Sequence, residues 1–293
     1  MTTFRDAVSV VTGGGGGIGR ACALAFAAAG SDVVVADIDG DAAASVAKEI
    51  EARGGRALAV TTDVGAQDDV ERLVQRAIAW QGHVDVYLSN AGIGVGGPPH
   101  LIPVEDWDLA LRVNLWASIW AMRGIVPHML ERGSGHIVFI SSPAGLWGVP
   151  MLSPYVTSKF ALNGYAESLA VFLKGKGVDV SIAMPGPPLA TDIIRSARVT
   201  YDEGDVSDDE MRTTADAAWS RIAVPPGDLA EVVTKGIEDG SFYIFHSPQT
   251  ATQASERFQN LDGWLAVMSS VVESDGHGTD PLVSSRKTAA KLT

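Results

Sequence analysis

Short apolar runs alternate with amphipathic stretches through the first two thirds of the chain, and this alternation limits the folds open to it. Ala7–Thr12 is a run of small and β-branched residues. The stretch after it carries apolar residues at helical spacing from Ile18 to Ala29. Near-continuous apolar strands separated by helices predict a parallel sheet with both faces covered. Right-handed crossovers then give a doubly wound α/β architecture of about seven strands.

The same pattern predicts the remaining elements. Strands are expected at Ala7–Thr12, Asp32–Asp37, Arg56–Thr62, Val84–Ser89, Gly135–Ser142, Val178–Met184 and Phe242–Phe245. Helices are expected at Asp41–Arg53, Asp68–Trp80, Val104–Arg132, Pro154–Lys174, Gly227–Glu238 and Gln249–Ser270. One domain is expected over residues 1–248, with a substrate lid at about 186–226. Residues 249–293 are expected to add a helical extension and a mobile tail to that domain.

Composition excludes several classes of protein. Hydrophobic residues make up 46% and charged residues 19%, a globular balance. The formal net charge of −13 disfavours nucleic acid and anionic membranes as partners. The single cysteine, Cys22, rules out an intramolecular disulfide, and the six histidines lack metal-ligand spacing, so we expect no metal. Without a signal-like or membrane-spanning apolar run, a cytoplasmic location is expected.

Five consecutive glycines follow the first predicted strand and open the first helix. Glycine permits positive φ and lets backbone N–H groups approach a pyrophosphate at a helix N-terminus. The residues expected to line such a site are Gly13, Gly16, Gly17, Ile18 and Gly19. Five glycines satisfy almost any glycine pattern, and a flexible turn is the alternative. Their place between strand and helix favours a dinucleotide site.

Asp37 ends the second predicted strand, 18 residues after Gly19. A carboxylate there can accept hydrogen bonds from both adenosine ribose hydroxyls and repels a 2′-phosphate. Neither Ile38 nor Gly16 offers the cation that a 2′-phosphate needs. Asp37 could instead be a turn residue before Asp39. Together with the glycine loop, this pattern predicts NAD as the cofactor.

Further motifs resemble those of the short-chain dehydrogenases/reductases, in their compact single-domain branch. Tyr155-Val156-Thr157-Ser158-Lys159 is similar to the family's Tyr-x-x-x-Lys signature. The other matches, in the family's order, are Thr12-Gly13 with Gly17 and Gly19, Asp63-Val64, Asn90-Ala91-Gly92, Asn114, Ser142 and Pro185-Gly186. The resemblance covers about residues 4–246 and implies a Rossmann-type fold. It implies that the nucleotide contacts Asp63, Val64, Asn90, Ala91, Gly92, Tyr155, Lys159, Pro185 and Gly186.

The resemblance also implies roles for four catalytic residues. Tyr155 and Lys159 are four apart on a helix and therefore share a face. An ammonium and an oxidised nicotinamide beside the phenol are expected to lower its pKa and make Tyr155 the acid/base. Ser142, 13 residues before Tyr155, would orient the reacting oxygen, with Ser141 facing away. Asn114 would anchor a water that relays protons to Lys159.

Simpler alternatives stand beside two of these roles. Asn114 could be a buried, satisfied amide. Asp63 could end a strand and cap a turn.

One segment departs from the family pattern. After Pro185-Gly186, Pro188 lacks an N–H and Ala190 stands where threonine is expected. A one-residue insertion would give the nicotinamide-carboxamide contacts to Leu189 and Thr191 instead. We favour that reading.

Large apolar residues in the segments expected to line the substrate site predict a hydrophobic secondary alcohol or ketone. They are Trp147, Val149, Met151, Leu152, Ile193, Ile194, Met211 and Trp219. An NADPH-linked ketone or 3-oxoacyl-thioester reductase is the alternative enzyme, and a non-catalytic dinucleotide sensor is the alternative of another class. The family resemblance implies a homo-oligomer, a dimer or tetramer, built through Val104–Arg132 and Pro154–Lys174. The C-terminal extension could cover the substrate cleft, add to the interface or block it.

Overall fold

A seven-stranded parallel sheet forms the centre of the protein in the computed structural model, which describes residues 3–186, 197–200 and 225–265. The strand order is β3-β2-β1-β4-β6-β7-β9. The strands are β1 (Val8–Thr12), β2 (Asp32–Asp37), β3 (Ala57–Thr61), β4 (Val86–Ser89), β6 (Gly135–Ile140), β7 (Val178–Met184) and β9 (Tyr243–Phe245). The order reverses beside β1, so the chain is doubly wound, as the alternating pattern predicts.

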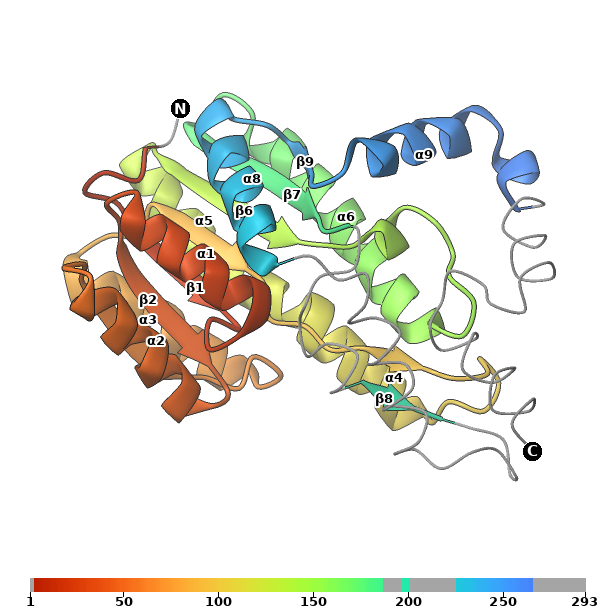
Figure 1. Ribbon diagram of the computed structural model, residues 1–293, viewed down its shortest axis with the longest axis horizontal. Coiled ribbons are helices and arrows are strands. Elements are labelled where there is room, and N and C mark those ends of the chain that lie inside the picture. The colour runs from red at the N-terminus through yellow and green to blue at the C-terminus, as the bar shows by residue number, and fades with distance from the viewer. Residues whose placement is uncertain (1–2, 187–196, 201–224, 266–293) are drawn as a thin grey trace.

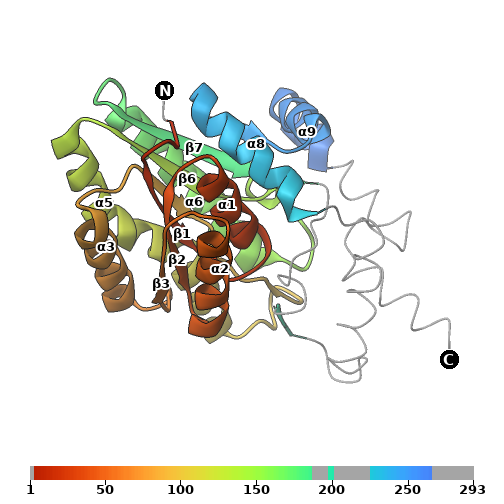
Figure 2. The same ribbon diagram turned by 60° about the vertical axis from the view of Figure 1, so that its left-hand side comes forward.

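Helices cover both faces of this sheet (Figures 1 and 2). One face carries α1 (Gly17–Ala28), α2 (Gly40–Ala52) and α8 (Pro226–Asp239). The other carries α3 (Gln67–Gln81), α5 (Ala117–Arg132) and α6 (Ser153–Leu173). Both faces of the sheet are therefore covered, which explains why every residue of β1 and β6 is buried.

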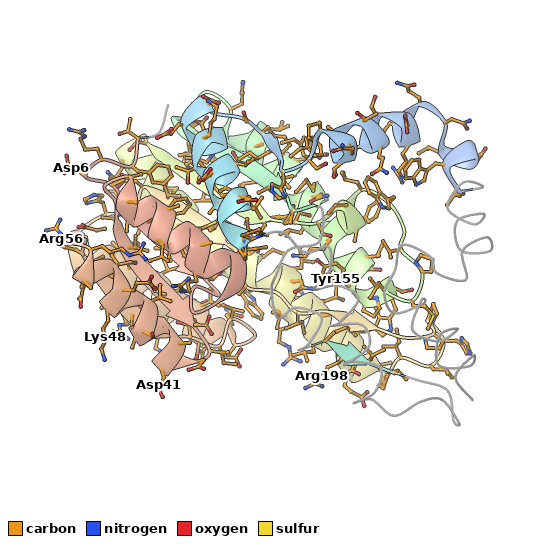
Figure 3. The ribbon with its side chains drawn as sticks, viewed as in Figure 1. Asp6, Asp41, Lys48, Arg56, Tyr155 and Arg198 are labelled. Carbon is orange, nitrogen blue, oxygen red and sulfur yellow. The ribbon has the colours of Figure 1, made fainter. Side chains whose placement is uncertain are left out.

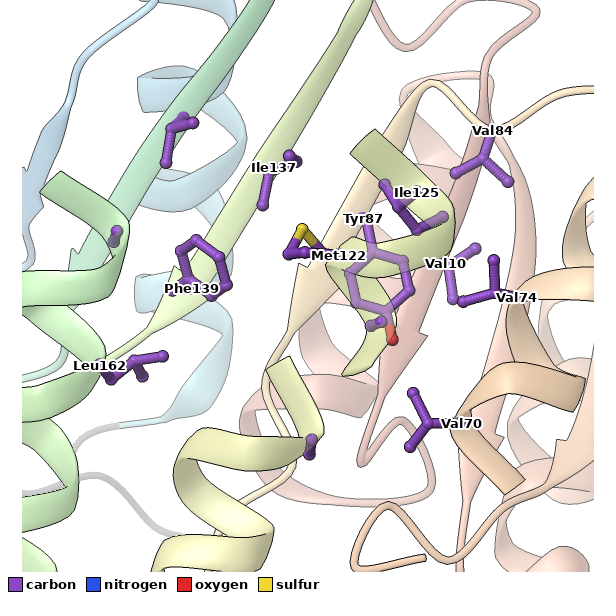
Figure 4. Close-up of a cluster of buried hydrophobic side chains, with 14 of the residues drawn as sticks. Val10, Val70, Val74, Val84, Tyr87, Met122, Ile125, Ile137, Phe139 and Leu162 are labelled. Carbon is purple, nitrogen blue, oxygen red and sulfur yellow. The ribbon is translucent and has the colours of Figure 1, made fainter. Parts of the chain in front are cut away.

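The core under α3, α5 and α6 is the larger of the two hydrophobic layers (Figure 4). Tyr87 of β4 and Phe139 of β6 point from the sheet into it. Ile125 of α5 and Leu162 of α6 pack against them from the helices. Each of these side chains is almost completely buried, so each contributes about 1.5–3 kcal/mol of hydrophobic stabilisation. This layer fixes α6 against β6, and α6 bears Tyr155 and Lys159.

The long helix predicted over Val104–Arg132 has the predicted ends but is not uniform. It consists of α4 (Val104–Leu111), one π-helical turn at Arg112–Trp116, and α5. Single π-helical turns inside α-helices commonly lie at functional sites. Asn114 occupies the middle of this turn, where its side chain is bonded to the backbone of another loop. Periodicity cannot detect such a turn because the apolar spacing around it is preserved.

The remaining differences are small. β6 ends at Ile140, two residues before Ser142. The predicted C-terminal helix is α9 (Pro248–Gln259), and the part of Gln249–Ser270 beyond 265 lies outside the described residues. A short parallel pair, β5 (Val95–Gly96) with β8 (Arg198–Val199), was not predicted, since two-residue strands leave no periodic signal. Among the residues described, no helix has both the length and the apolar character required to cross a bilayer.

His136 is buried in β6 with only one of its ring nitrogens satisfied by the described residues. Ser181 donates to the carbonyl of Ser241 at 2.6 Å, so its hydroxyl oxygen accepts from His136 Nε2 at 2.7 Å. His136 Nδ1 is buried without a hydrogen-bond partner among those residues. Burial lowers the pKa of His136 from 6.5 to about 4.

This burial predicts acid sensitivity. As pH falls below 6.5, the unfolded chain binds a proton at this position before the folded chain does. The stabilisation by neutral His136 is therefore complete above pH 6.5 and lost as pH falls toward about 4. The full loss is about 3 kcal/mol. We expect His136→Gln to remove that part of the pH dependence, measured by urea unfolding at pH 7 and near pH 4.5.

His100→Gln is the matched control, because the His100 side chain is exposed. An equal fall in the free energy of unfolding for wild type and His136→Gln would contradict the prediction.

Candidate active site

Three loops meet where the carboxyl ends of β1, β4 and β6 lie side by side. The hydroxyl of Thr12, at the end of β1, accepts the N–H groups of Asn90 at 3.0 Å and Ala91 at 3.2 Å. Asn90 Nδ2 in turn donates to the carbonyls of Thr12 at 2.9 Å and Gly13 at 3.2 Å. The glycine loop and the Asn90-Ala91-Gly92 segment are thus held together by side chains at the switch point of the sheet, where ligands bind in open α/β folds.

The glycine loop is shaped to receive an anion. Gly13 and Gly17 have positive φ values of 63° and 48°. A Cβ on Gly19 would lie 2.0 Å from the carbonyl oxygen of Gly13. Helix α1 begins at Gly17, just before Ile18, and its N-cap, Gly16, provides no side-chain hydrogen bond. The first N–H groups of α1 therefore fit a pyrophosphate, which would satisfy them and the positive end of the helix dipole.

Asp37 lies beside this loop at the end of β2. One carboxylate oxygen accepts the N–H of Gly15 at 2.8 Å, and the other accepts the N–H of Asp39 at 3.0 Å. The contact to Asp39 is one that a turn residue makes, which is the alternative role considered for Asp37. The contact to Gly15 places the carboxylate against the glycine loop. Ile38 is exposed. No cation accompanies Asp37 at either neighbouring position.

Asp63 and Val64 follow β3. Asp63 is exposed and its Oδ1 accepts the N–H of Gly65 at 2.8 Å, so it caps the turn before α3. Its own N–H donates to Asp69 at 3.2 Å. Val64 packs into the core. The turn-capping alternative for Asp63 is therefore realised, while a nucleotide contact for this pair stays a prediction.

Asn114 is buried, and every polar atom of its amide has a partner. Its Oδ1 accepts the N–H of Ile93 at 2.9 Å, and its Nδ2 donates to the carbonyl of Ile93 and to Ser158 Oγ, both at 3.0 Å. Ser158 Oγ donates to the carbonyl of Tyr155 at 2.7 Å. The satisfied-amide alternative is thus realised, and the same bonds connect the π-helical turn to the backbone carbonyl of Tyr155.

Lys159 is buried on α6, one turn beyond Tyr155. Its Nζ donates to the carbonyl of Ile140 at 3.0 Å and lies 5.7 Å from the centre of the Tyr155 ring. A Cβ on Gly92 would lie 3.7 Å from this Nζ. Burial lowers the pKa of Lys159 to about 8. The ammonium is therefore poised to lose or regain a proton near neutral pH.

Tyr155 faces Ser142 across the gap between α6 and the end of β6, and Figure 3 labels Tyr155 on α6. Burial opposes the lowering of the phenol's pKa that Lys159 and an oxidised nicotinamide are expected to cause. Burial raises the pKa of Tyr155, and the hydrogen bond with the Ser142 hydroxyl lowers it by less. Ser142 Oγ also accepts the N–H of Ala144 at 3.1 Å. Ser141 points elsewhere, donating to Asn163 Oδ1 at 2.6 Å.

Pro185 and Gly186 directly follow β7, at the same edge of the sheet. A Cβ on Gly186 would lie 3.2 Å from Thr250 Oγ1 of α9 and 3.6 Å from Pro143. Thr191 and the competing positions Leu189, Pro188 and Ala190 lie outside the described residues, as do Ile193, Ile194, Met211, Trp219 and most of the predicted lid.

Two contacts in this region have no counterpart in the sequence-based prediction. Asn163, four residues beyond Lys159, bonds to the residue before Ser142. Trp264 packs against Trp147, with ring centres 5.5 Å apart. Helical spacing alone places Asn163 on the face of Lys159, but only the fold identifies its partners. In the described segments, no three His, Cys, Asp or Glu side chains lie together as metal ligands would.

The geometry agrees with the comparisons to known proteins. A model of the short-chain dehydrogenase family matches residues 7–202. The chain belongs to the short-chain dehydrogenase family.

Three relatives of this short-chain dehydrogenase illustrate the range of the family. The 1-deoxy-11-beta-hydroxypentalenate dehydrogenase of Streptomyces exfoliatus is 33% identical, over 88% of this chain and 89% of that one. A short-chain dehydrogenase/reductase from Burkholderia phymatum, solved with NAD, has a TM-score of 0.80 and 29% identity over 89% and 96% of the two chains. A metagenomic short-chain oxidoreductase, solved with NADP, has a TM-score of 0.66 and 31% identity over 83% and 97%.

The protein is therefore an oxidoreductase of hydroxyl or keto groups that binds a nicotinamide dinucleotide. The structure shows the matching Rossmann-type sheet, with the glycine loop at its switch point.

Two glycines of the loop differ sharply in the space around them, which gives a matched pair of substitutions. Gly19→Ala places a methyl group 2.0 Å from the Gly13 carbonyl and 2.6 Å from Asn90 Nδ2, so the loop must shift. We expect it to lower the free energy of unfolding by about 3 kcal/mol. Gly16→Ala meets no atom within 4 Å and should change stability by less than about 0.5 kcal/mol. Urea unfolding of both variants tests this, and equal losses would contradict the loop geometry.

Proposed function

We propose that this protein is an NAD-dependent oxidoreductase that transfers hydride between the nicotinamide and a hydrophobic secondary alcohol or ketone, with Tyr155 as the acid/base. The observation that supports it most is the packing of α6 against the end of β6. This packing brings the Tyr155 phenol to the Ser142 hydroxyl and buries the Lys159 ammonium beside its ring.

The chemistry divides between cofactor and chain. A bound nicotinamide supplies the hydride acceptor for alcohol oxidation, or the donor for ketone reduction. Tyr155, as the phenolate, accepts the proton of the substrate hydroxyl, and as the phenol it returns a proton to the carbonyl oxygen. Ser142 donates a hydrogen bond to that oxygen and orients it. Both groups must face the substrate from a water-poor site for this to be efficient.

A proton must also leave Tyr155 after each oxidation. The Lys159 ammonium, whose pKa burial lowers to about 8, can pass a proton onward near neutral pH. The carbonyl of Ile93 accepts from Asn114 Nδ2 at 3.0 Å and keeps a second lone pair that can accept from a relay water. We infer that Asn114 acts through this carbonyl rather than through its own amide, since all of its amide atoms are already bonded.

NAD rather than NADP is favoured by charge at the adenosine end. The Asp37 carboxylate lies against Gly15 of the loop, where a 2′-phosphate would meet like charge. The nearest arginine on α1, Arg20, is paired with Glu49 at 2.5 Å. Ile38 has no charge to offer. Asp37 would exchange its backbone contacts for the ribose hydroxyls. By the family resemblance, Lys159 and Tyr155 would contact the nicotinamide ribose. With the one-residue insertion, Leu189 and Thr191 would contact the carboxamide.

The substrate class is favoured by aromatic side chains near Ser142. Trp147 lies five residues beyond Ser142 and packs on Trp264 of the C-terminal extension. Arg257 of α9 lies over the Phe160 ring of α6, with its guanidinium carbon 5.7 Å from the ring centre. The extension is thereby joined to the segment expected to line the substrate site. Of the three roles open to it, covering that site is the one these contacts favour.

Assembly and location complete the proposal. Trp116 stacks on Trp120 of α5 with ring centres 6.3 Å apart, and Trp116 is half exposed. Val171 and Phe172, near the end of α6, are also exposed. Large apolar side chains at these helix surfaces favour a homo-oligomer. We also propose a cytoplasmic location, and the acidic net charge disfavours nucleic-acid and anionic-membrane partners.

Tyr155→Phe tests the proposed chemistry. The variant keeps the ring but loses the ionisable group, so turnover of a panel of apolar secondary alcohols with NAD⁺ should fall at least about 10²-fold. NAD⁺ binding, measured by calorimetry, should fall much less than turnover does, because the loop and Asp37 are untouched and only the contact of the hydroxyl to the nicotinamide ribose is lost. The matched control is Tyr165→Phe, which removes a hydroxyl from the same helix farther along.

Wild-type activity that survives in Tyr155→Phe would contradict the role of Tyr155. A strong preference for NADP⁺ in the same assay would contradict the role of Asp37 and favour the NADPH-linked reductase.

A further inference from the structure

Three consecutive residues at the end of β6 contact three successive turns of α6. Ile140 accepts from Lys159, Ser141 donates to Asn163, and the Ser142 hydroxyl lies near enough to Tyr155 to influence its pKa. The helix partners are spaced by four, so they share one face. The contact of Ile140 with Lys159 and that of Ser142 with Tyr155 involve the proposed catalytic residues. The middle contact has no part in the chemistry proposed above.

Asn163 joins both ends of the segment that contains Ser142. Its Oδ1 accepts from Ser141 Oγ at 2.6 Å, and its Nδ2 donates to the carbonyl of Gly145 at 2.9 Å. Both Asn163 and Ser141 are buried, with exposed fractions of 5% and 2%. One rigid amide plane therefore fixes the backbone just before Ser142 and three residues after it.

Packing at Gly145 leaves no room for the Ser141–Gly145 segment to move. A Cβ there would lie 2.6 Å from Asn163 Nδ2, 2.9 Å from the carbonyl of Lys159 and 3.0 Å from Ser141 Oγ. The segment between is one 3₁₀ turn, Pro143–Gly145, closed by a hydrogen bond from Gly145 N–H to the Ser142 carbonyl at 2.8 Å. The turn is thus held on the same face of α6 that presents Tyr155.

The direction of the Ser142 hydroxyl depends on this turn. Ser142 Oγ accepts the N–H of Ala144 at 3.1 Å, so its remaining hydrogen is available to Tyr155 or to a substrate oxygen. If the turn moved away from α6, the Ser142 hydroxyl would move with Ala144 and away from Tyr155.

We propose that Asn163 is a positioning residue, which holds the Ser141–Gly145 turn on α6 and thereby aims the Ser142 hydroxyl at Tyr155. This inference rests on the proposed function, because it assigns a purpose to the Ser142–Tyr155 contact. A purely structural Asn163 would stabilise the fold but leave the ionisation of Tyr155 unchanged.

The experiment measures the ionisation of Tyr155 without a substrate. The ultraviolet absorbance of phenolate is titrated against pH, and the curve of the matching Tyr155→Phe protein is subtracted. Asn163→Leu removes both hydrogen bonds at similar size, and Ser141→Ala removes one of them with a smaller disturbance. Ser142→Ala is the positive reference. Ser9→Ala is the control. It deletes a buried hydroxyl on β1 that is bonded to Ser31 at 2.7 Å and lies in the other hydrophobic layer.

The Ser142 hydrogen bond lowers the pKa of Tyr155, so its loss should move the ionisation to higher pH. We expect Asn163→Leu and Ser141→Ala to move it in the same direction as Ser142→Ala, while Ser9→Ala leaves it at the wild-type position. Turnover of an alcohol substrate should fall by up to about 10²-fold in Asn163→Leu, with unchanged affinity for NAD⁺.

The outcomes separate this inference from the function on which it rests. If Ser142→Ala moves the ionisation but folded Asn163→Leu and Ser141→Ala do not, the positioning role is overturned and the proposed function stands. Should Asn163→Leu fail to fold, Ser141→Ala decides by the same criterion. If Ser142→Ala has no effect on Tyr155 and Tyr155→Phe keeps full activity, the proposed function is overturned and this inference with it.

Discussion

The packing of α6 across the carboxyl end of β6 is the constraint on which the rest of the site depends. The sheet side of this contact is made by Ile140 and the two serines after it, where the strand has ended but the backbone is still fixed by β7. The helix side is one face of α6, anchored below by Leu162 in the core. A shift of one residue along either element would separate every pair at once. The apolar layer under α6 therefore acts on the chemistry as well as on stability.

Burial of this contact shifts the pKa of both Tyr155 and Lys159. Desolvation disfavours charge on both partners, raising the pKa of Tyr155 and lowering that of Lys159 to about 8. A phenol in this condition is a poor base by itself. The Ser142 hydroxyl opposes the shift, and a positively charged nicotinamide beside the ring would oppose it further. In the mechanism that we propose, Tyr155 stays protonated until the oxidised cofactor is present, so that proton removal is restricted to the complex that can also accept hydride.

Sequence patterns could predict the architecture because it is encoded by periodicity and by glycine placement. The doubly wound sheet, the loop at Gly13–Gly19 and the helix bearing Tyr155 and Lys159 all follow from such signals. Hydrogen bonds between distant segments leave no such signal. The partners of Asn163 and Trp264 therefore could not be predicted, and the π-helical turn at Asn114 was not detected because it preserves the apolar spacing. The lowering of the Tyr155 pKa expected from Lys159 and an oxidised nicotinamide stays a prediction, and burial, which the neighbouring residues in the sequence do not reveal, opposes it.

In the function that we propose, the oxidised nicotinamide converts a buried, protonated Tyr155 into a base. The most direct measurement is the ionisation of Tyr155, taken as the absorbance difference between wild type and Tyr155→Phe, with NAD⁺ bound and with ADP-ribose bound. NAD⁺ should move the ionisation to lower pH than ADP-ribose does, because only NAD⁺ places a positive ring beside the phenol. Identical titrations with the two ligands, both saturating, would contradict it.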